Sequence, residues 1–386
     1  MSEASIIPSS SSALAANVPY SQATDQRNQL QNNTEPDGVP NLTSTGYDCI
    51  RYMGACNGGQ IYLGQKKSLD DSEKLFVAIK KFCIDDIDDY HAIAKETAHM
   101  RSFNHENILK LCECFVLEKY IYQITPAMNL GSLFDIVFEY KKWGLNERAT
   151  AAITHQVLNG LNYLHERRFI HRDVKTRHIL IDSDGNVKLT GFRFMVELNH
   201  HLDCVFDYDS SLHNQIYYLA PEVLKQNMQG YTSKSDIYML GISICEAING
   251  VMPFAELEPL EMLLRKMNGQ VPRPVDKFSL ADDQDIGIDI SHRPKEHLER
   301  EFSDEMHLFI ANCLNFDPQI RKSASDLKKS DWLGSEKFRD LKPADVREEL
   351  ALDYSHFQLS LWGQEPVLPP EPEQRYEVVF DYDSMS

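Results

Sequence analysis

The feature that most limits the fold is a helical stretch with almost no polar face. Residues 236–249 are nonpolar nearly throughout from Ile237 to Ile248. A helix that is apolar all round has to be buried on all sides, which predicts that it lies at the centre of a sizeable helical domain. A second helix is predicted over residues 147–166, because apolar side chains recur there on one face at Ile153, Val157, Leu161 and Leu164.

The chain before Gly131 has a different pattern, made of short apolar runs between turn residues. The runs at 60–63, 76–80 and 121–125 have the length of β-strands. Residues 89–103 carry apolar or uncharged side chains on one stripe, which suits a helix packed on a small sheet. Strands followed by helices predict an α+β fold.

Both ends of the chain lack the composition of a packed domain. Residues 1–45 are rich in Ser, Asn, Gln and Pro, so we expect a disordered N-terminal tail. Residues 334–386 include the run VLPPEPEQ, so we expect an acidic, Pro-containing C-terminal tail. The folded domain is expected to span 46–333, with a smaller lobe at 46–128 and a larger lobe at 129–333.

Charge and hydropathy argue against several classes of function. The 386 residues include 39 Lys and Arg against 58 Asp and Glu, a net charge of −19. This balance argues against binding to nucleic acid or anionic lipid. No apolar stretch approaches the roughly 20 residues that span a bilayer, so no membrane insertion is expected. The 8 cysteines are scattered without metal-ligand spacing, which indicates reduced thiols in an intracellular protein.

Three short motifs occur in an order that resembles the protein kinases. VAIK ends at Lys80, whose amine could reach phosphate oxygens when a carboxylate holds it, and Glu96 is the matching carboxylate. HRD ends at Asp173, the position of the catalytic base. APE ends at Glu222, with which Arg321 is expected to form a structural clamp. The ordered set implies a bilobal protein-kinase-like fold, with a β-rich N-lobe containing one helix and a larger helical C-lobe.

Both residues that hold magnesium in kinases are replaced. The Asn five residues after the HRD aspartate is His178 here, and the DFG motif reads Gly191-Phe192-Arg193, so that Gly191 stands for its aspartate. Phosphoryl transfer depends on positioning and on neutralising charge at the phosphates, so each lost contributor costs on the order of a hundredfold or more in rate. We therefore expect no metal site and no functional catalytic residue, with Asp173 a vestigial base position.

The glycine-rich segment is kept in part. Gly54 and Gly59 are the first and third glycines of GxGxxG, and Cys56 stands at the second. A close backbone approach to phosphate is then less easy, so nucleotide binding is weakened but not lost.

Positive charge is available to replace the metal. A fixed guanidinium from Arg193, together with Lys175 and His178, could neutralise a triphosphate. On the adenine side, counting back from Gly131 places Thr125 at the gatekeeper position and Met128 in the hinge, where its backbone amide could donate. These residues predict ATP binding without metal and without turnover.

The segment before APE is also altered. Active kinases have Gly-Thr there, whereas this chain has Asn214-Gln215. A hydroxyl that ties the segment to the catalytic residues is therefore missing at Gln215. The surface that would hold a peptide substrate is expected either to hold a partner or to fold back on its own lobe.

Longer runs resemble one family, the STRAD pseudokinases, which are STE20-related adaptors. The resemblance covers about residues 46–333, and its most specific marks are His178, the Gly-x-Arg at 191–193 and Met-Gln-Gly-Tyr at 228–231. The runs that carry it are HRDVKTRHILIDSDGNVKLTGFR, PEVLKQNMQGYTSKSDIYMLGISICEAINGVMPF and EMLLRKMNGQVP.

The resemblance implies an adaptor that binds ATP without metal, adopts a closed, active-like shape and activates a partner. The implied partners are a Ser/Thr kinase of the liver kinase B (partitioning-defective) type and a helical-repeat scaffold protein. The implied setting is polarity and growth or energy signalling in the cytoplasm, with nuclear or cortical pools as alternatives. Two other functions stay open: a slow or metal-atypical Ser/Thr protein kinase, since Asp173 and Lys80 are intact, and a passive scaffold that binds no nucleotide.

Overall fold

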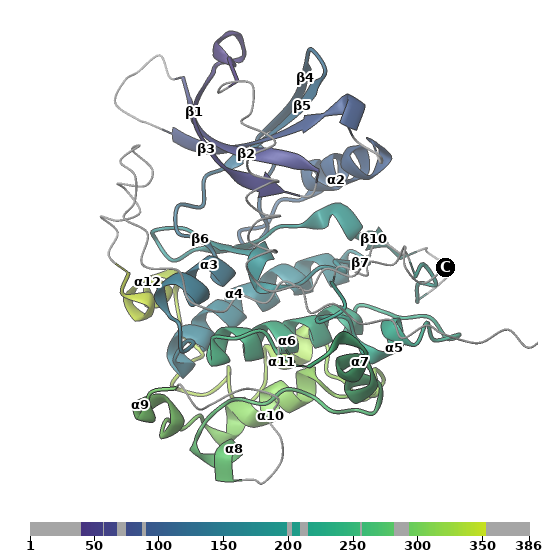
Figure 1. Cartoon of the computed structure of the whole chain (residues 1–386), viewed down its shortest axis with the longest axis vertical. Coiled ribbons are helices and arrows are strands. Elements are labelled where there is room, and N and C mark those ends of the chain that lie inside the picture. Colours follow the sequence, from purple (N-terminus) through teal and green to yellow (C-terminus); the bar gives the residue numbers. More distant parts are fainter. Residues whose placement is uncertain are drawn as a thin grey trace, which may run out of the picture. The chain divides into compact units, whose positions relative to one another are not determined.

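The structure is a computed structural model that describes residues 40–56, 58–67, 75–86, 90–198, 203–208, 215–254, 257–281 and 293–352. The expected α+β architecture is confirmed, because the first part of the chain forms a β-sheet with one long helix and the second part is mainly helical (Figure 1). Of the two expected tails, residues 1–39 and 353–386 lie outside the described residues.

The N-lobe is a five-stranded antiparallel sheet with the strand order β1-β2-β3-β5-β4. The runs at 60–63, 76–80 and 121–125 all lie in its strands, as predicted, whereas β1 and β4 were not predicted. Strand β1 carries no continuous apolar run, and β4 contains a short one at 114–117. The strands are β1 (Tyr47–Cys56), β2 (Gly59–Lys66), β3 (Leu75–Cys83), β4 (Glu113–Leu117) and β5 (Tyr120–Pro126).

Apolar side chains pack on both faces of this sheet. On one face, Tyr62 and Ile79 belong to a buried cluster that also includes Leu42, which precedes the lobe boundary expected at residue 46. On the other face lies helix α2 (Tyr90–Ser102), whose Ile93 packs with residues of β3 and β5. Because side chains alternate along a strand, Lys80 of β3 points to the face that α2 covers.

The C-lobe is built around the two helices predicted from the sequence, α4 (Glu147–Glu166) and α6 (Lys234–Asn249). The side chain of Asn146 caps α4 by accepting a hydrogen bond from a backbone N–H of its first turn at 2.8 Å. Every residue of α6 after the first is buried, as its composition predicts. The helix ends at Gly250, whose φ of +67° lies in the left-handed region that favours glycine.

Shorter elements complete the C-lobe. The helices are α3 (Leu133–Asp135), η3 (Ile136–Tyr140), η4 (Thr176–His178), η5 (Phe192–Phe194), α5 (Pro221–Leu224), α7 (Pro259–Met267), α8 (Lys277–Ala281), α9 (Lys295–Leu298), α10 (Asp304–Cys313), α11 (Ala324–Leu327) and α12 (Pro343–Leu350). The short strands are β6 (Gly131–Ser132), β7 (Phe169–Ile170), β8 (Ile179–Ile181), β9 (Val187–Leu189) and β10 (Val196–Glu197). In the described ranges no helix is both long and apolar enough to cross a membrane.

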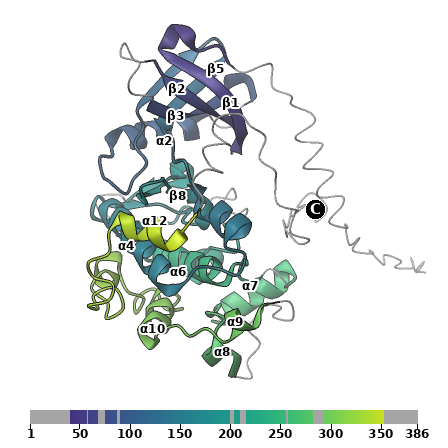
Figure 2. The ribbon, with the colours of Figure 1, turned by 90° about the vertical axis from the view of Figure 1, so that its left-hand side faces the viewer.

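The packed C-lobe continues past residue 333, where we expected a tail to begin. Phe338, Val346 and Leu350 are buried in the main core, and α12 lies against α4 (Figure 2). Arg148 of α4 forms ion pairs with Asp345 and Glu349. A few apolar side chains placed at helical spacing, with two ion pairs, are enough to hold residues 334–352 although their overall composition is acidic.

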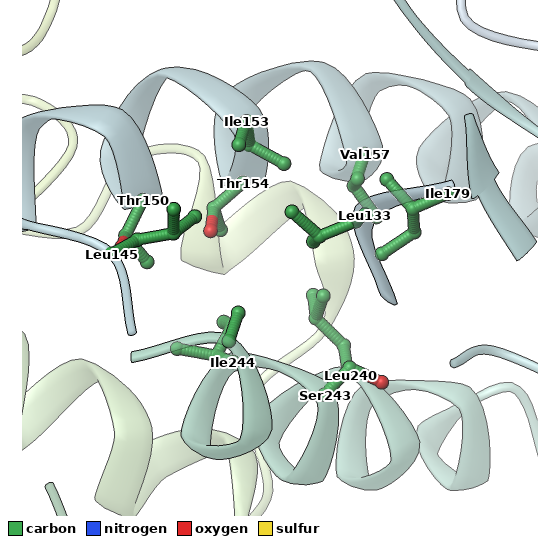
Figure 3. A pocket seen from close by; sticks show the side chains of 11 residues that line it. Leu133, Leu145, Thr150, Ile153, Thr154, Val157, Ile179, Leu240, Ser243 and Ile244 are labelled. Atoms are coloured by element: carbon green, nitrogen blue, oxygen red, sulfur yellow. The ribbon is translucent and has the colours of Figure 1, made fainter. Parts of the chain in front are cut away.

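A small cavity lies between α4 and α6, and mostly apolar side chains line it (Figure 3). Three hydroxyl groups also line it. The Thr150 and Ser243 hydroxyls donate to backbone carbonyls of their own helices, at 2.7 and 2.8 Å. The hydroxyl of Thr154, which projects from α4 toward α6, takes part in no hydrogen bond recorded among the described residues.

Replacing this hydroxyl by a methyl group should stabilise the protein. The Thr154 side chain lines a mostly apolar cavity in which a methyl group packs more favourably than a hydroxyl, so Thr154→Val should raise the free energy of unfolding by about 1 kcal/mol. Thr150→Val on the same helix is the matched control, because it removes a hydroxyl that is bonded and should leave stability unchanged or lower. Urea unfolding of both variants checks this, and a Thr154→Val variant less stable than the parent would contradict it.

Candidate functional site

The first turn of α6 holds the catalytic loop, residues 171–178, which connects β7 to β8. The Asp236 carboxylate accepts hydrogen bonds from the backbone N–H groups of His171 and Arg172, both at 2.8 Å. The His171 Nε2 donates to the Thr190 carbonyl at 3.0 Å, and its Nδ1 accepts from the Asp173 N–H at 3.2 Å. Burial lowers the pKa of His171, so a neutral ring makes both bonds. The loop is therefore fixed by groups of the chain itself.

Asp173, at the base position, is buried and already faces two side chains. The Lys175 Nζ lies 2.8 Å from its Oδ1, and the His178 Nδ1 lies 3.2 Å from its Oδ2. Burial raises the pKa of Asp173, while the charge of Lys175 opposes this shift. Lys175, which we expected at the phosphates, is thus paired with the carboxylate. The Asp173 carboxylate therefore makes its contacts within the catalytic loop.

The two replaced magnesium-ligand positions pack against each other. Gly191 has φ +86°, and a Cβ there would lie 2.3 Å from the Nδ1 and 2.6 Å from the Cγ of His178. The His178 Nδ1–H donates to the Asp173 carbonyl at 2.9 Å, which fixes the ring. The ring therefore fills the space in which a side chain at position 191 would begin. The sequence motifs identified His178 and Gly191 as replaced positions. That the two residues touch could be seen only in the folded structure.

His178 carries no positive charge in this setting. Burial lowers its pKa well below the usual value, and the nearby charges of Lys175 and Lys80 act in the same direction. The expectation that His178 neutralises phosphate charge therefore needs correction, since the cationic groups at this place are Lys80, Lys175 and Arg193. Within the described ranges, no group of three or more His, Cys, Asp or Glu side chains is arranged to hold a metal ion.

Lys80, Glu96 and Arg193 converge around the thiol of Cys56. Burial raises the pKa of Cys56, the charges of Lys80 and Arg193 lower it, and the charge of Glu96 raises it. Arg193 also reaches the turn between β1 and β2, where its Nη1 lies 3.8 Å from the position of a Cβ on Gly58. The expected pairing of Lys80 with Glu96 is not among the ion pairs of the described residues, which extend to 4.0 Å.

The two retained glycines of the glycine-rich segment have structural reasons to be there. Gly54 has φ +153°, a backbone conformation that other residues rarely adopt. A Cβ on Gly59 would lie 2.6 Å from the Phe82 ring and 2.8 Å from the Lys81 carbonyl, so glycine is needed for β2 to approach β3. Both requirements come from the sheet and hold without any nucleotide.

The hinge keeps the features from which adenine recognition was expected. Thr125 is buried in β5 opposite Ala78. The Met128 side chain is buried, and its carbonyl accepts a hydrogen bond from the Gly131 N–H at 2.9 Å. Among the described residues, no hydrogen bond is recorded for the Met128 N–H. This amide is therefore a donor that a ligand could use.

A buried carboxylate outside the motifs ties the catalytic loop to the segment before APE. The Glu246 Oε2 accepts hydrogen bonds from the Thr176 hydroxyl and the Tyr218 hydroxyl, both at 2.7 Å. Burial raises the pKa of Glu246 to about 7. This tie does the work expected of the hydroxyl that is missing at Gln215. The sequence contained a signal, because Glu246 is the one carboxylate within the apolar stretch 237–248 and a buried carboxylate needs a partner.

Two buried cations hold the end of the same segment. The expected clamp is confirmed, since Arg321 donates to both Glu222 oxygens at 2.6 and 3.0 Å. Lys266 of α7 donates to the carbonyls of Ile216 and Tyr217 at 3.1 and 2.8 Å. Burial lowers the pKa of Lys266 to about 7. No motif pointed to Lys266, which reads in the sequence as an ordinary surface lysine.

Comparison with known proteins agrees with this geometry. The family model of the protein kinase domain matches residues 47–333. The STE20-related kinase adapter protein strd-1 of Caenorhabditis elegans is 70% identical over 97% of this chain and 97% of its own length. The STE20-related kinase adapter protein alpha of Homo sapiens is 35% identical over 58% of each chain. The human beta protein is 31% identical over 73% of this chain and 72% of its own length. The chain therefore belongs to the STE20-related kinase adapter (STRAD) family of the protein kinase superfamily.

Proposed function

We propose that this protein is a pseudokinase adapter that binds ATP without a metal ion and activates a partner Ser/Thr kinase. The packing of the His178 ring against Gly191 carries the proposal. At the place where a kinase presents two metal-binding side chains, this chain has a neutral ring against a residue without a side chain. The printed names of its relatives, kinase adapter proteins, support the adapter role.

The residues around the cleft fit a triphosphate better than a metal complex of it. ATP, when bound, supplies a highly charged triphosphate anion, and three cations are at hand in Lys80, Lys175 and Arg193. Arg193 is suited to this role because a guanidinium keeps its charge and presents several donors in a plane. The Met128 N–H is available on the adenine side. Asp173, paired with Lys175, takes no part in proton transfer in this proposal.

A nucleotide held in this way would act as a conformational ligand. Lys80 comes from the N-lobe sheet, whereas Lys175 and Arg193 come from the C-lobe. An anion between them favours the arrangement in which the lobes approach each other, and a partner that recognises this arrangement binds more tightly when ATP is bound. We propose that the partner is a Ser/Thr kinase of the liver kinase B type in a cytoplasmic complex that also includes a helical-repeat scaffold protein. A slow, metal-atypical kinase is the alternative, because Lys80 and Asp173 are retained.

ATP should stabilise the purified chain in EDTA as much as in magnesium. At 100 times its dissociation constant, ATP should add about 2.7 kcal/mol to the free energy of unfolding.

Arg193→Ala should weaken ATP binding roughly tenfold or more, since it removes a charge-assisted contact. Arg167→Ala, which removes an exposed arginine that lies on the Tyr163 ring, is the control and should bind ATP normally. Thermal-shift titrations measure both effects. A shift seen only with magnesium would favour the slow kinase, and no shift under either condition would favour a passive scaffold.

Restoring the metal-binding residues should require both substitutions at once. Gly191→Asp alone should lower stability by several kcal/mol, because its Cβ would clash with the His178 ring. Gly46→Asp is the matched control, since Gly46 also has φ +86° but has no atom within 4 Å of the Cβ position. Adding His178→Asn should recover at least about 1 kcal/mol relative to Gly191→Asp alone. Urea unfolding of these three variants and of His178→Asn alone measures this coupling, and additive effects would contradict the proposed contact.

The adapter role itself is tested with a partner. A liver kinase B type kinase should phosphorylate its peptide substrate faster when this chain is added, whereas the chain alone should transfer no phosphate from ATP. The unmodified chain and the Gly191→Asp/His178→Asn double variant are compared in the same radiometric assay. Autonomous activity of the unmodified chain would overturn the pseudokinase assignment, and an unchanged rate of the partner would overturn the activator role.

A further inference from the structure

An ion pair that is buried on the Arg172 side holds residues 203–208, which lie between Gly191 and Glu222 in the sequence. Arg172 follows His171 in the catalytic loop, has φ +67° and is only 6% exposed. Its Nη1 donates to the Asp207 carboxylate at 2.9 Å, and its Nη2 donates to the Asp207 carbonyl at 3.1 Å. One arginine therefore holds both the side chain and the backbone of Asp207.

The residues around Asp207 are held to the chain near Tyr231. The Tyr231 hydroxyl donates to the Asp207 carbonyl at 2.7 Å. Val205 and Tyr231 exchange two backbone hydrogen bonds at 2.8 and 2.9 Å. The Arg172 guanidinium also lies 5.8 Å from the Tyr231 ring. The ion pair is thus the charged part of a wider contact between residues 203–208 and the chain at residue 231.

In kinases that are switched on by phosphorylation, such a segment is ordered when a phosphate pairs with arginine. A guanidinium does not lose its proton in a protein, so a buried one requires a negative partner. Here that partner is a carboxylate encoded in the sequence. A carboxylate is charged at neutral pH without any modifying enzyme, whereas a phosphate has to be added.

We propose that Asp207 takes the place of a regulatory phosphate, so that residues 203–208 hold their docked conformation without phosphorylation. The ordering of these residues is a property of the isolated chain. Its use as a ready-made surface for the partner kinase rests on the proposed adapter function.

The chain provides a matched control pair in the same segment. Asp203, four residues earlier, forms an ion pair with Arg168 at 3.2 Å. That pair is open to solvent, with side chains 36% exposed for Arg168 and 96% for Asp203, whereas the values are 6% for Arg172 and 56% for Asp207. An exposed pair contributes little to stability, so loss of Asp203 should matter much less than loss of Asp207.

Hydrogen exchange of the full chain tests the proposal without a partner. In Asp207→Asn, the backbone amides of Val205 and Tyr231 should exchange about tenfold faster or more, because the buried guanidinium loses its counter-charge. In Asp203→Asn they should exchange within about twofold of the parent rate. If Asp207→Asn does not fold, the double variant Arg172→Met/Asp207→Asn, which removes both charges, is measured in its place. Recovery of folding in the double variant would support the conclusion that Asp207 is needed to neutralise the buried Arg172. Equal exchange in Asp207→Asn and Asp203→Asn would overturn the proposal.

The competing source of negative charge is a phosphate on Ser210 or Ser211, which follow in the sequence. Chain treated with phosphatase, and the Ser210→Ala/Ser211→Ala variant, should show the parent exchange rates at Val205 and Tyr231. Faster exchange in either would assign the role to phosphate and overturn the proposal. A loss of activation of the partner kinase with unchanged exchange rates would count against the adapter function and leave the role of Asp207 intact.

Discussion

The position of the catalytic loop depends on the buried carboxylate of Asp236. It accepts two backbone hydrogen bonds from the catalytic loop, and its Oδ2 lies 2.8 Å from the Nε2 of His165. Burial alone would raise the pKa of Asp236, but the hydrogen bonds and charges of His165 and His171 outweigh burial and lower it. The group therefore stabilises the fold above the ordinary carboxylate pKa and loses this effect as the pH falls below it. The catalytic loop is held in place here although no catalysis is expected. A surface that binds a ligand or a partner needs a fixed loop as much as an active site does.

Much of the fold could be predicted because its large elements repeat a pattern over many residues. Helix α4 begins and ends at the predicted residues, and α6 is buried on all sides as its composition requires. The end of the domain could not be placed in this way. Residues 334–352 resemble a tail in composition, and only the tertiary positions of Phe338, Val346 and Leu350 decide that they pack. Edge strand β1 could not be recognised from an apolar run, since polar residues and glycine interrupt its apolar ones.

At the candidate site, the order of the sequence motifs identified several residues but could not show which of them contact one another. It named His178 and Gly191 as replaced positions, yet their packing depends on a backbone angle and a ring orientation that no spacing encodes. It assigned Lys175 to phosphate but could not show that its Nζ lies 2.8 Å from the Asp173 carboxylate in the structure without ligand. Asp207 and Glu246 lie outside all motifs, and each became visible only as the partner of a group that burial would otherwise leave unsatisfied.

The contact between His178 and Gly191 also bears on how such a site can change over generations. A single substitution of Gly191 would bring a side chain into the ring, and a single substitution of His178 would leave a space beside a glycine with no ligand to offer. Neither step alone brings back a pair of metal ligands, and the first carries a cost in folding that selection can act on. The route back to two metal-binding side chains therefore depends on the order of the substitutions, because only replacement of His178 before Gly191 avoids the clash.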